Sequence, residues 1–181
     1  SRPRVTYDGN VSISTKTKSI DVMGADEYRN FVTDRFGAES SAVKLLGKEN
    51  TDWQKEIFRT AVGTDHNITV SGGLNNMPYR VSAGYTNQNG ILKTSKFERY
   101  TGSVNLAPSF FEDHLNINFT AKGMISNNRF ADTGAIGAAI AFDPTQPVMN
   151  GNSKYGGYFA WENAGEFISI ATKNPVAMLQ Q

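Results

Sequence analysis

Five stretches of the chain alternate polar and apolar residues with period two, and the clearest runs from Phe97 to Ala107. One side of that stretch carries Tyr100, Gly102, Val104 and Leu106. The other side carries Arg99, Thr101, Ser103 and Asn105. Period two places each set on its own face of a sheet. Strands of soluble proteins usually have about 5–6 residues, whereas a tilted membrane-spanning strand needs about 9–11. The pattern therefore favours the wall of an outer-membrane barrel.

The alternation predicts strands over about 4–17, 65–75, 79–88, 96–107 and 114–127. In the last of these, one face carries Leu115, Ile117, Phe119, Ala121 and Ile125. Short turns are expected at 75–78 and 108–113, with a modest hairpin link at 90–95. The connections 18–63 and 129–181 are long. Long connections on one side of a meander and short turns on the other are typical of extracellular loops and periplasmic turns.

Helical patterns fall inside the two long connections. A helix over 26–36 begins with an acidic turn and ends before Gly37, and a short one is expected over 40–46. A third helix begins at Thr51, where Thr51 and Gln54 have capping-box spacing. Small residues over 134–142 predict another, and Asn174-Pro175 begins a last one. The predicted fold is all-β with helical loop insertions.

Composition narrows the function classes. The chain has 181 residues, a formal net charge of +1 and no cysteine. A balanced charge gives no argument for nucleic acid, and the lack of cysteine removes disulfides and thiolate metal sites. The two histidines lie far apart, and no nucleophile-elbow or P-loop spacing occurs. We therefore expect no catalytic residue, no metal and no cofactor. Because the chain opens without a signal peptide, we expect a mature piece or an internal fragment.

Six stretches, in order, resemble the SusC/RagA class of TonB-dependent outer-membrane transporters. They cover 50–61, 66–73, 79–92, 97–106, 138–148 and 174–177. The resemblance implies a plug domain followed by a 22-stranded barrel in the bacterial outer membrane. It implies that residues 1–181 form the first five antiparallel strands of that barrel, with the plug and the remaining strands absent from the chain. An open five-stranded piece would leave a lipid-facing edge unpaired, so we expect it to be part of something larger.

The resemblance also implies the function and the partners. It indicates TonB-energised import of glycans or oligopeptides, with a SusD-like surface lipoprotein as lid. The other expected partners are the plug, the rest of the barrel, outer-membrane lipid, and TonB through the missing N-terminal part. One alternative is a TonB-dependent importer of a metal chelate. Another is a soluble β-rich binding module, in which a second sheet would bury the apolar face.

Two groups of residues are candidate contacts. The aromatic residues Tyr155, Tyr158 and Trp161, with Phe159, offer faces that stack on a sugar, clamp a peptide or meet the lid. The alternative is that they pack the long loop against its neighbours, which we favour because aromatic side chains usually fill such loops. The polar residues expected to face the barrel lumen are Arg80, Arg99, Asn105 and Lys122. Their expected role is pairing with a plug rather than binding substrate.

Overall fold

The computed structural model describes residues 2–163, 166–167 and 171–180. The chain divides into two compact units. One unit comprises residues up to 15 together with 60–91 and 95–130, and it contains the long strands. The other comprises 16–59, 92–94 and the residues from 131 onward, and it contains the helices. Among the described residues, no helix is long and apolar enough to cross a membrane.

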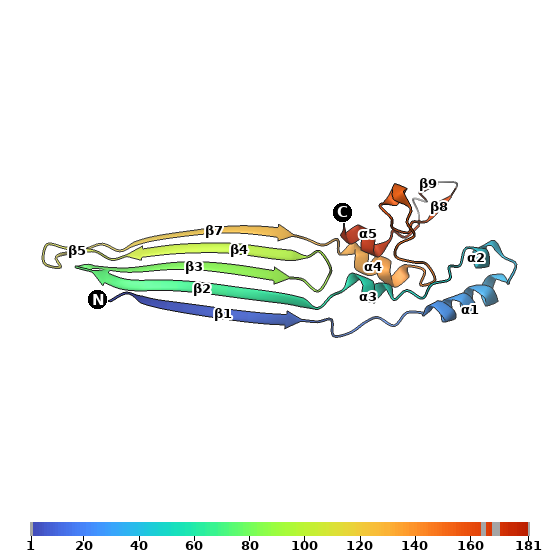
Figure 1. The fold of residues 1–181 in the computed structure, drawn as a ribbon, viewed down its shortest axis with the longest axis horizontal. Helices are drawn as coiled ribbons and strands as arrows, with labels where there is room; N and C mark the ends of the chain where they lie inside the picture. The colour runs from blue at the N-terminus through green and yellow to red at the C-terminus, as the bar shows by residue number, and fades with distance from the viewer. Residues whose placement is uncertain (1, 164–165, 168–170, 181) are drawn as a thin grey trace. The chain divides into compact units, whose positions relative to one another are not determined.

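The strand unit is a five-stranded antiparallel sheet in which neighbours in sequence are neighbours in space (Figure 1). Each strand has between 11 and 14 residues. In spatial order the strands are β1 (Arg4–Ser14), β2 (Ala61–Leu74), β3 (Met77–Asn89), β4 (Lys96–Leu106) and β7 (Phe119–Arg129). Five long strands in a meander are what the alternation predicted.

Several predicted strand boundaries were wrong, among them the end of the last strand, which is Arg129 rather than 127. β1 ends at Ser14 rather than 17, where its last residue pairs with Ala61. β2 therefore begins at Ala61 rather than 65, because small residues there hide the alternation. β3 begins at Met77 rather than 79, since the turn is only Asn75 and Asn76, with φ of 49° at Asn75. The predicted long connections 18–63 and 129–181 accordingly become 15–60 and the residues after Arg129.

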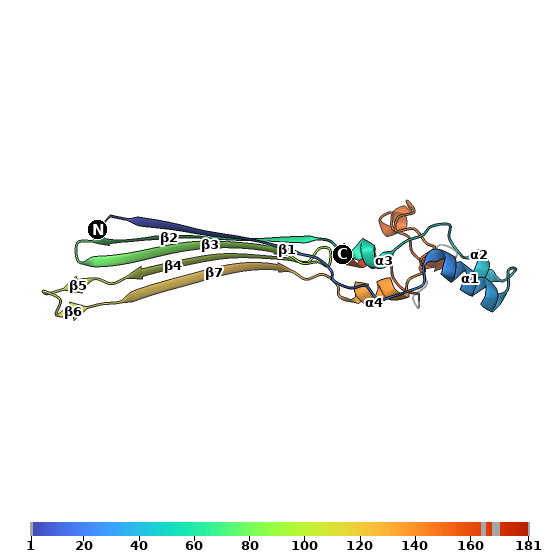
Figure 2. The ribbon, with the colours of Figure 1, turned by 90° about the horizontal axis from the view of Figure 1, so that it is seen from below.

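The predicted strand over 114–127 is divided. Its first part is β6 (Leu115–Asn116), which pairs with β5 (Ser109–Phe110) in the segment expected to be a turn. The ladder of β5 with β6 nevertheless has the same register as the ladder of β4 with β7 (Phe119–Arg129). In the gap between the two ladders, the Ile117 amide donates to the Pro108 carbonyl at 3.0 Å. Proline has no N–H to donate, which explains the break in the ladder. Figure 2 shows this hairpin tip beyond the turn that joins β2 and β3.

The helical unit contains every helix that the sequence predicted. These are α1 (Ala25–Phe36), α2 (Ser41–Lys44), α3 (Trp53–Ile57), α4 (Gly134–Ala141) and α5 (Pro175–Leu179). The predicted capping box of α3 was wrong: Asp52 caps the helix by accepting from the Lys55 amide at 3.2 Å. Thr51 instead donates its hydroxyl to the Gln146 carbonyl at 2.7 Å. The sequence did not predict the 3-10 helix η1 (Ser153–Tyr155) or the pair β8 (Glu162–Asn163) and β9 (Glu166–Phe167).

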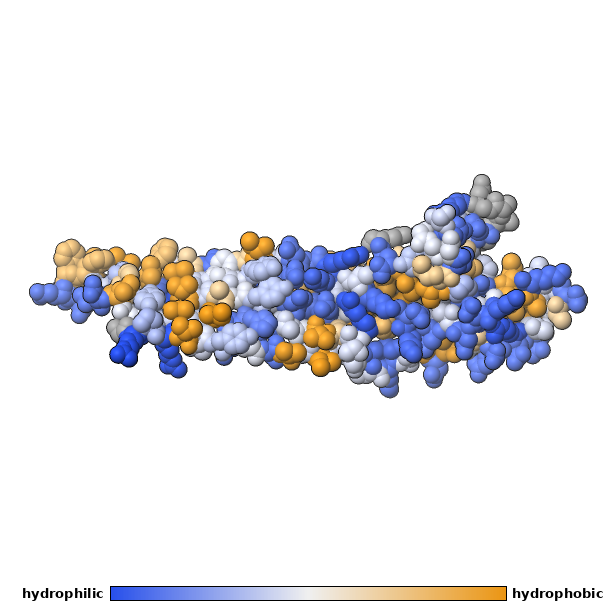
Figure 3. Space-filling model, viewed as in Figure 1, coloured by the Kyte–Doolittle hydropathy of each residue, from blue (hydrophilic) through white to orange (hydrophobic). Residues whose placement is uncertain are grey.

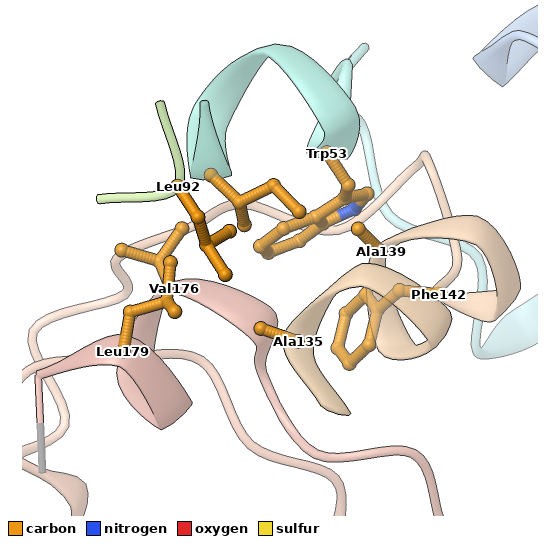
Figure 4. Packing of buried hydrophobic residues seen from close by; sticks show 8 residues of the cluster. Trp53, Leu92, Ala135, Ala139, Phe142, Val176 and Leu179 are labelled. Atoms are coloured by element: carbon orange, nitrogen blue, oxygen red, sulfur yellow. The ribbon is translucent and has the colours of Figure 1, made fainter. Parts of the chain in front are cut away.

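The hydrophobic core of the described residues lies in the helical unit, where α3, α4 and α5 meet (Figure 4). Ala135 and Ala139 are one helical turn apart, and both are buried, so α4 presents a small-residue face to its neighbours. The small side chains explain why short helices pack closely here. The cluster consists of Trp53, Ile57, Leu92, Ala135, Ala139, Phe142, Val176 and Leu179.

A buried polar turn fastens the segment before α3 to the end of α4. The Asp143 carboxylate accepts from the amide and the hydroxyl of Thr145, at 2.8 and 2.7 Å. The Thr145 hydroxyl oxygen in turn accepts from the Gly47 amide at 2.8 Å, and its carbonyl accepts from the Glu49 amide at 3.0 Å. These bonds satisfy polar groups that burial would otherwise penalise. The turn therefore holds 47–53 in place without a helix or strand of its own.

Candidate functional site

The register brings the apolar residues of all five strands onto one face of the sheet. Pairing places them in rows that cross the sheet from strand to strand. One row is entirely aliphatic: Val5, Val70, Val81, Val104 and Ala121. The next row toward the long connections consists of Tyr7, Ile68, Ala83, Gly102 and Gly123. The sheet thus carries a continuous apolar band, called the apolar face below.

The apolar face is exposed. Val5, Phe119 and Ile125 keep 67%, 53% and 68% of their surface accessible. In Figure 3 hydrophobic residues gather over the part of the sheet nearer to its β5 end. Within the described residues no second sheet covers this face. A large exposed apolar surface indicates a membrane or an interface with another structure.

The opposite face is polar and is called the polar face below. One of its rows consists of Arg4, Ser71, Arg80, Asn105 and Thr120. The next row consists of Thr6, Thr69, Ser82, Ser103 and Lys122. Asn105 donates from its Nδ2 to Asn118 Oδ1 at 3.0 Å and to Thr120 Oγ1 at 2.8 Å. A shallow hollow of about 430 Å³ lies among Arg80, Asn105 and Lys122. These three predicted residues therefore come together on one face.

Arg99 shares the polar face but lies in a separate row. That row contains Asn10, Asp65, Thr86, Arg99 and Ser126. Thr86 is buried and donates to Asp65 Oδ1 at 2.8 Å. The Arg99 guanidinium carbon lies 5.7 Å from the centre of the Phe97 ring. The polar face therefore combines cations, many hydroxyls and a hydrogen bond from buried Thr86 to exposed Asp65.

The apolar face carries a contact between a tyrosine and a histidine that the sequence did not indicate. The Tyr7 hydroxyl and His66 Nδ1 are 2.5 Å apart, and the two rings stack with centres 6.0 Å apart. The residues occupy diagonal positions on neighbouring strands, because His66 pairs with Gly9. Such a contact is visible only once the register is known. It satisfies a histidine that would otherwise be a bare polar group on an apolar surface.

The predicted aromatic contact residues lie beside the helical core. Trp53, Phe142, Phe159 and Trp161 form a chain of edge-to-face rings, with successive centres 4.5, 6.0 and 5.2 Å apart. Tyr158 and Trp161 are half-buried against the core cluster. Tyr155 ends η1, where the Lys154 ammonium lies 5.3 Å from its ring centre. Much of this aromatic surface is therefore used in packing.

The helical unit also contains a cavity of about 740 Å³, bounded by the extended segment 19–24 and by the start of α3. Gln54 is buried and holds that segment through both ends of its amide: Oε1 accepts from the Ile20 amide at 2.9 Å, and Nε2 donates to the Ile20 carbonyl at 2.7 Å. Tyr28 lines the cavity, and burial, followed by the nearby Asp143 carboxylate, raises the pKa of its phenol. The phenol is therefore a neutral donor at physiological pH.

Asn174 is a second buried amide with a complete set of partners. Its Oδ1 accepts from the amides of Val176 and Ala177, which caps α5, and its Nδ2 donates to the carbonyls of Val148 and Phe159, each at 3.0 Å. The sequence indicated the cap, through Asn before Pro, but not the bridge to two distant loops. The sequence indicated Gln54 only through its capping-box spacing, and it gave no signal that the side chains of Gln54 and Asp143 are buried.

Comparison with known proteins shows which family the chain resembles. No protein-family model matches the chain. The chain is 55% identical to the TonB-dependent receptor SusC of Bacteroides thetaiotaomicron over 165 aligned residues. These aligned residues cover 89% of this chain and 16% of that protein. It is 29% identical over 164 residues to the TonB-dependent receptor P3 of Formosa agariphila, covering 86% of this chain and 16% of that protein. The chain therefore spans about a sixth of the length of these relatives.

Solved structures agree with this family. The RagAB peptide transporter matches over 97% of this chain and 24% of its own, with a TM-score of 0.65 and 20% identity. The RagAB peptide importer in its closed-closed state matches over 73% of this chain and 18% of its own, with a TM-score of 0.54 and 28% identity. Sequence and fold together identify the chain as a segment of a SusC/RagA-type TonB-dependent transporter, a protein of the bacterial outer membrane.

Proposed function

We propose that the chain forms the first five strands of a 22-stranded barrel wall, in a transporter that imports glycans or oligopeptides with energy from TonB. The observation that carries this proposal is the single register across β1, β2, β3, β4 and β7, which separates a continuous apolar face from a continuous polar face. The apolar face meets lipid, and the polar face lines the lumen.

The partners follow from the same arrangement. β1 and β7 are the two edges of the sheet, so their outer backbone groups pair with further strands of the same barrel. Arg80, Asn105 and Lys122 meet the plug that fills the lumen. Residues 15–60 and those after Arg129 form extracellular loops, and a SusD-like lipoprotein closes over them as a lid. Tyr155, Tyr158 and Trp161 contribute the parts of their rings that loop packing leaves exposed.

Two neighbouring substitutions in the full-length transporter test the assignment of the faces. Ile68 lies on the apolar face, whereas Asn67 lies on the polar face opposite Asp8. Ile68→Arg should lower the free energy of unfolding by about 2–4 kcal/mol, because it places a charge in the hydrocarbon layer. Asn67→Arg should be tolerated, because the lumen is wet and Asp8 is near.

The measurement is denaturant unfolding in detergent or bilayers, together with the amount of folded protein in the outer membrane and the uptake of nutrient. We expect Ile68→Arg to lose assembly and uptake together, while Asn67→Arg keeps both. Equal stability of the two variants would contradict the proposed orientation of the sheet.

A further inference from the structure

The apolar face ends at different rows on different strands. At the end nearer the long connections, pairing places Ile13 of β1 in one row with Lys96 of β4 and Arg129 of β7. Ile13 keeps 70% of its surface accessible. On β4 and β7 the outermost apolar residues of this face are Tyr100 and Ile125, each four residues further in than the charged residue of its strand. The boundary between apolar and polar residues therefore moves inward by two rows from β1 to β7.

Charged and amide side chains occupy the corner that this step leaves. Glu98 and Asn127 pair in the row beside Lys96, whose Nζ lies 3.3 Å from Glu98 Oε1. In that same row β1 carries Val11, which is exposed. Charge on the lipid-facing side of a barrel strand is destabilising, and the cost becomes small only near the membrane interfaces. A hydrocarbon layer that covers these two rows on β1 therefore leaves them uncovered on β4 and β7.

The opposite boundary moves in the same direction. The Ser109 amide donates to the Asn76 carbonyl at 3.0 Å, in the register of β3 with β4, so this register reaches the turn between β2 and β3. The last apolar row of β2 and β3 therefore consists of Leu74, Met77, Pro108 and Ile117. One further row lies beyond that turn, where Phe110 pairs with Leu115 and the two keep 47% and 43% of their surface accessible. On this side the apolar face extends one row further on the β5–β6 hairpin than on β2 and β3.

Both steps define the same inclination. The first moves four residues along the strands, or roughly 13 Å, across four strand spacings, or roughly 19 Å. The second moves two residues, or roughly 7 Å, across the two spacings, or roughly 10 Å, that separate the middle of the β2–β3 pair from the middle of the β4–β7 pair. Each ratio corresponds to an angle of about 35°, within the strand tilt of about 35–45° in outer-membrane barrels. At this tilt the stretch from Tyr100 to Phe110 spans about 27 Å along the membrane normal, close to the apolar band of about 25 Å in such barrels.

We propose that lipid contacts the apolar face as an oblique belt, inclined by about 35° to the cross-strand rows, and that this belt includes the β5–β6 hairpin. The inference rests on the proposed function, because the apolar face must meet lipid. Acyl chains contact Ile13 at one corner of the belt and Phe110, Leu115 and Ile117 at the opposite corner. The charged ends of β4 and β7 and the acidic tip of the hairpin lie in water. The segment 108–113, expected from the sequence to be a short turn, is therefore largely part of the barrel wall.

Two spin labels in one row test the inclination. They are attached to the variants Ile13→Cys and Arg129→Cys of the full-length transporter in a phospholipid bilayer, and relaxation by oxygen and by a water-soluble nickel complex measures the depth of each. The label at Ile13 should lie about 11 Å deeper than the label at Arg129, because their row crosses roughly 19 Å of a sheet tilted by about 35°. The matched control is a label at Ile125, two rows further in on the strand of Arg129, which should lie at the depth of Ile13. Equal depths at Ile13 and Arg129 would overturn the oblique belt.

A second pair of labels tests the hairpin. Oxygen should relax a label at Ile117, and the nickel complex should relax a label at Glu112, which lies at the tip beyond the last apolar row. Relaxation of the Ile117 label by the nickel complex would place the hairpin in water. Protection of that label from both reagents would show that protein covers the hairpin. Either result would overturn the lipid assignment.

Labels at Phe119 and Thr120 separate these outcomes from failure of the proposed function, because they report only which face of the sheet meets lipid. If oxygen relaxes the label at Phe119 while Ile13 and Arg129 lie at one depth, the barrel wall stands and the inclination is wrong. If oxygen reaches no label on the apolar face, the barrel wall and the belt are both wrong.

Discussion

At the scale of single residues, glycines on the apolar face have two different roles. The Tyr79 ring lies over Gly72, its partner on β2, so that a Cβ there would meet Tyr79 Oη at 2.7 Å and Cζ at 3.0 Å. The Tyr7 ring covers Gly9 in a similar way. Gly102 is different, because a Cβ there would meet nothing within 4 Å. An aromatic ring that covers a neighbouring glycine fills the gap in the sheet surface and fixes the rotamer of the ring.

This difference predicts opposite outcomes for two glycine-to-alanine substitutions. Gly72→Ala should lower the free energy of unfolding of the full-length transporter by about 1 kcal/mol or more, because the Tyr79 ring must move. Gly102→Ala should be neutral or slightly stabilising, because a strand glycine carries an entropic cost and its Cβ has room. Denaturant unfolding in detergent compares the two. Greater destabilisation by Gly102→Ala would show that the rings do not cover the glycines as described.

At the scale of elements, the sequence predicted the long strands because each strand carries mainly apolar residues on one face and mainly polar residues on the other. Period two survives wherever the side chains are large enough to show it. It failed at Ala61 and Gly63, which are small non-polar residues on the polar face, and at Pro108, where a missing donor interrupts a ladder whose register continues. The α3 cap was misplaced because Thr51 is used in a tertiary bond that its own neighbours do not reveal.

For the candidate contact residues too, the sequence indicated the face or the segment but not the tertiary contacts. Alternation put Arg80, Asn105 and Lys122 on one face, and the register brought them together. Composition pointed to the aromatic residues after Tyr155, but only tertiary packing reveals that Trp161 stacks on Phe159. Buried amides such as Gln54 and Asn174 gave no sequence signal of their tertiary bonds, since their partners are backbone groups far along the chain.

Gln54 links two elements, and its removal should release one of them. Gln54→Ala deletes both hydrogen bonds to Ile20, so the extended segment 19–24 should open more often. We expect the Ile20 amide to exchange about tenfold faster, equivalent to roughly 1.4 kcal/mol for the two lost bonds. Hydrogen exchange followed by mass spectrometry measures it. Lys55→Ala, at an exposed position of α3, is the control. Wild-type exchange in the Gln54→Ala variant would mean that other contacts hold the segment.

At the scale of the whole molecule, the two faces of the sheet are the main result. Most large apolar side chains of the strand unit lie on one face, where they are exposed or half-buried, and the described hydrophobic core belongs to the helical unit. A soluble sheet of this size would need a covering layer to be stable. In the proposed barrel, lipid covers the apolar face, and the lumen with its plug covers the polar face.

The most direct test of the two faces is the side to which neighbouring residues of β7 point in the full-length transporter. Spin labels at Phe119 and Thr120 in a lipid bilayer report it, because lipid-soluble oxygen relaxes a label in the hydrocarbon layer and a water-soluble nickel complex relaxes one in the lumen. We predict that oxygen relaxes the label at Phe119 and the nickel complex relaxes the label at Thr120. Oxygen relaxation at Thr120 with none at Phe119 would contradict the proposed barrel wall, since a register slip by one residue exchanges the two faces.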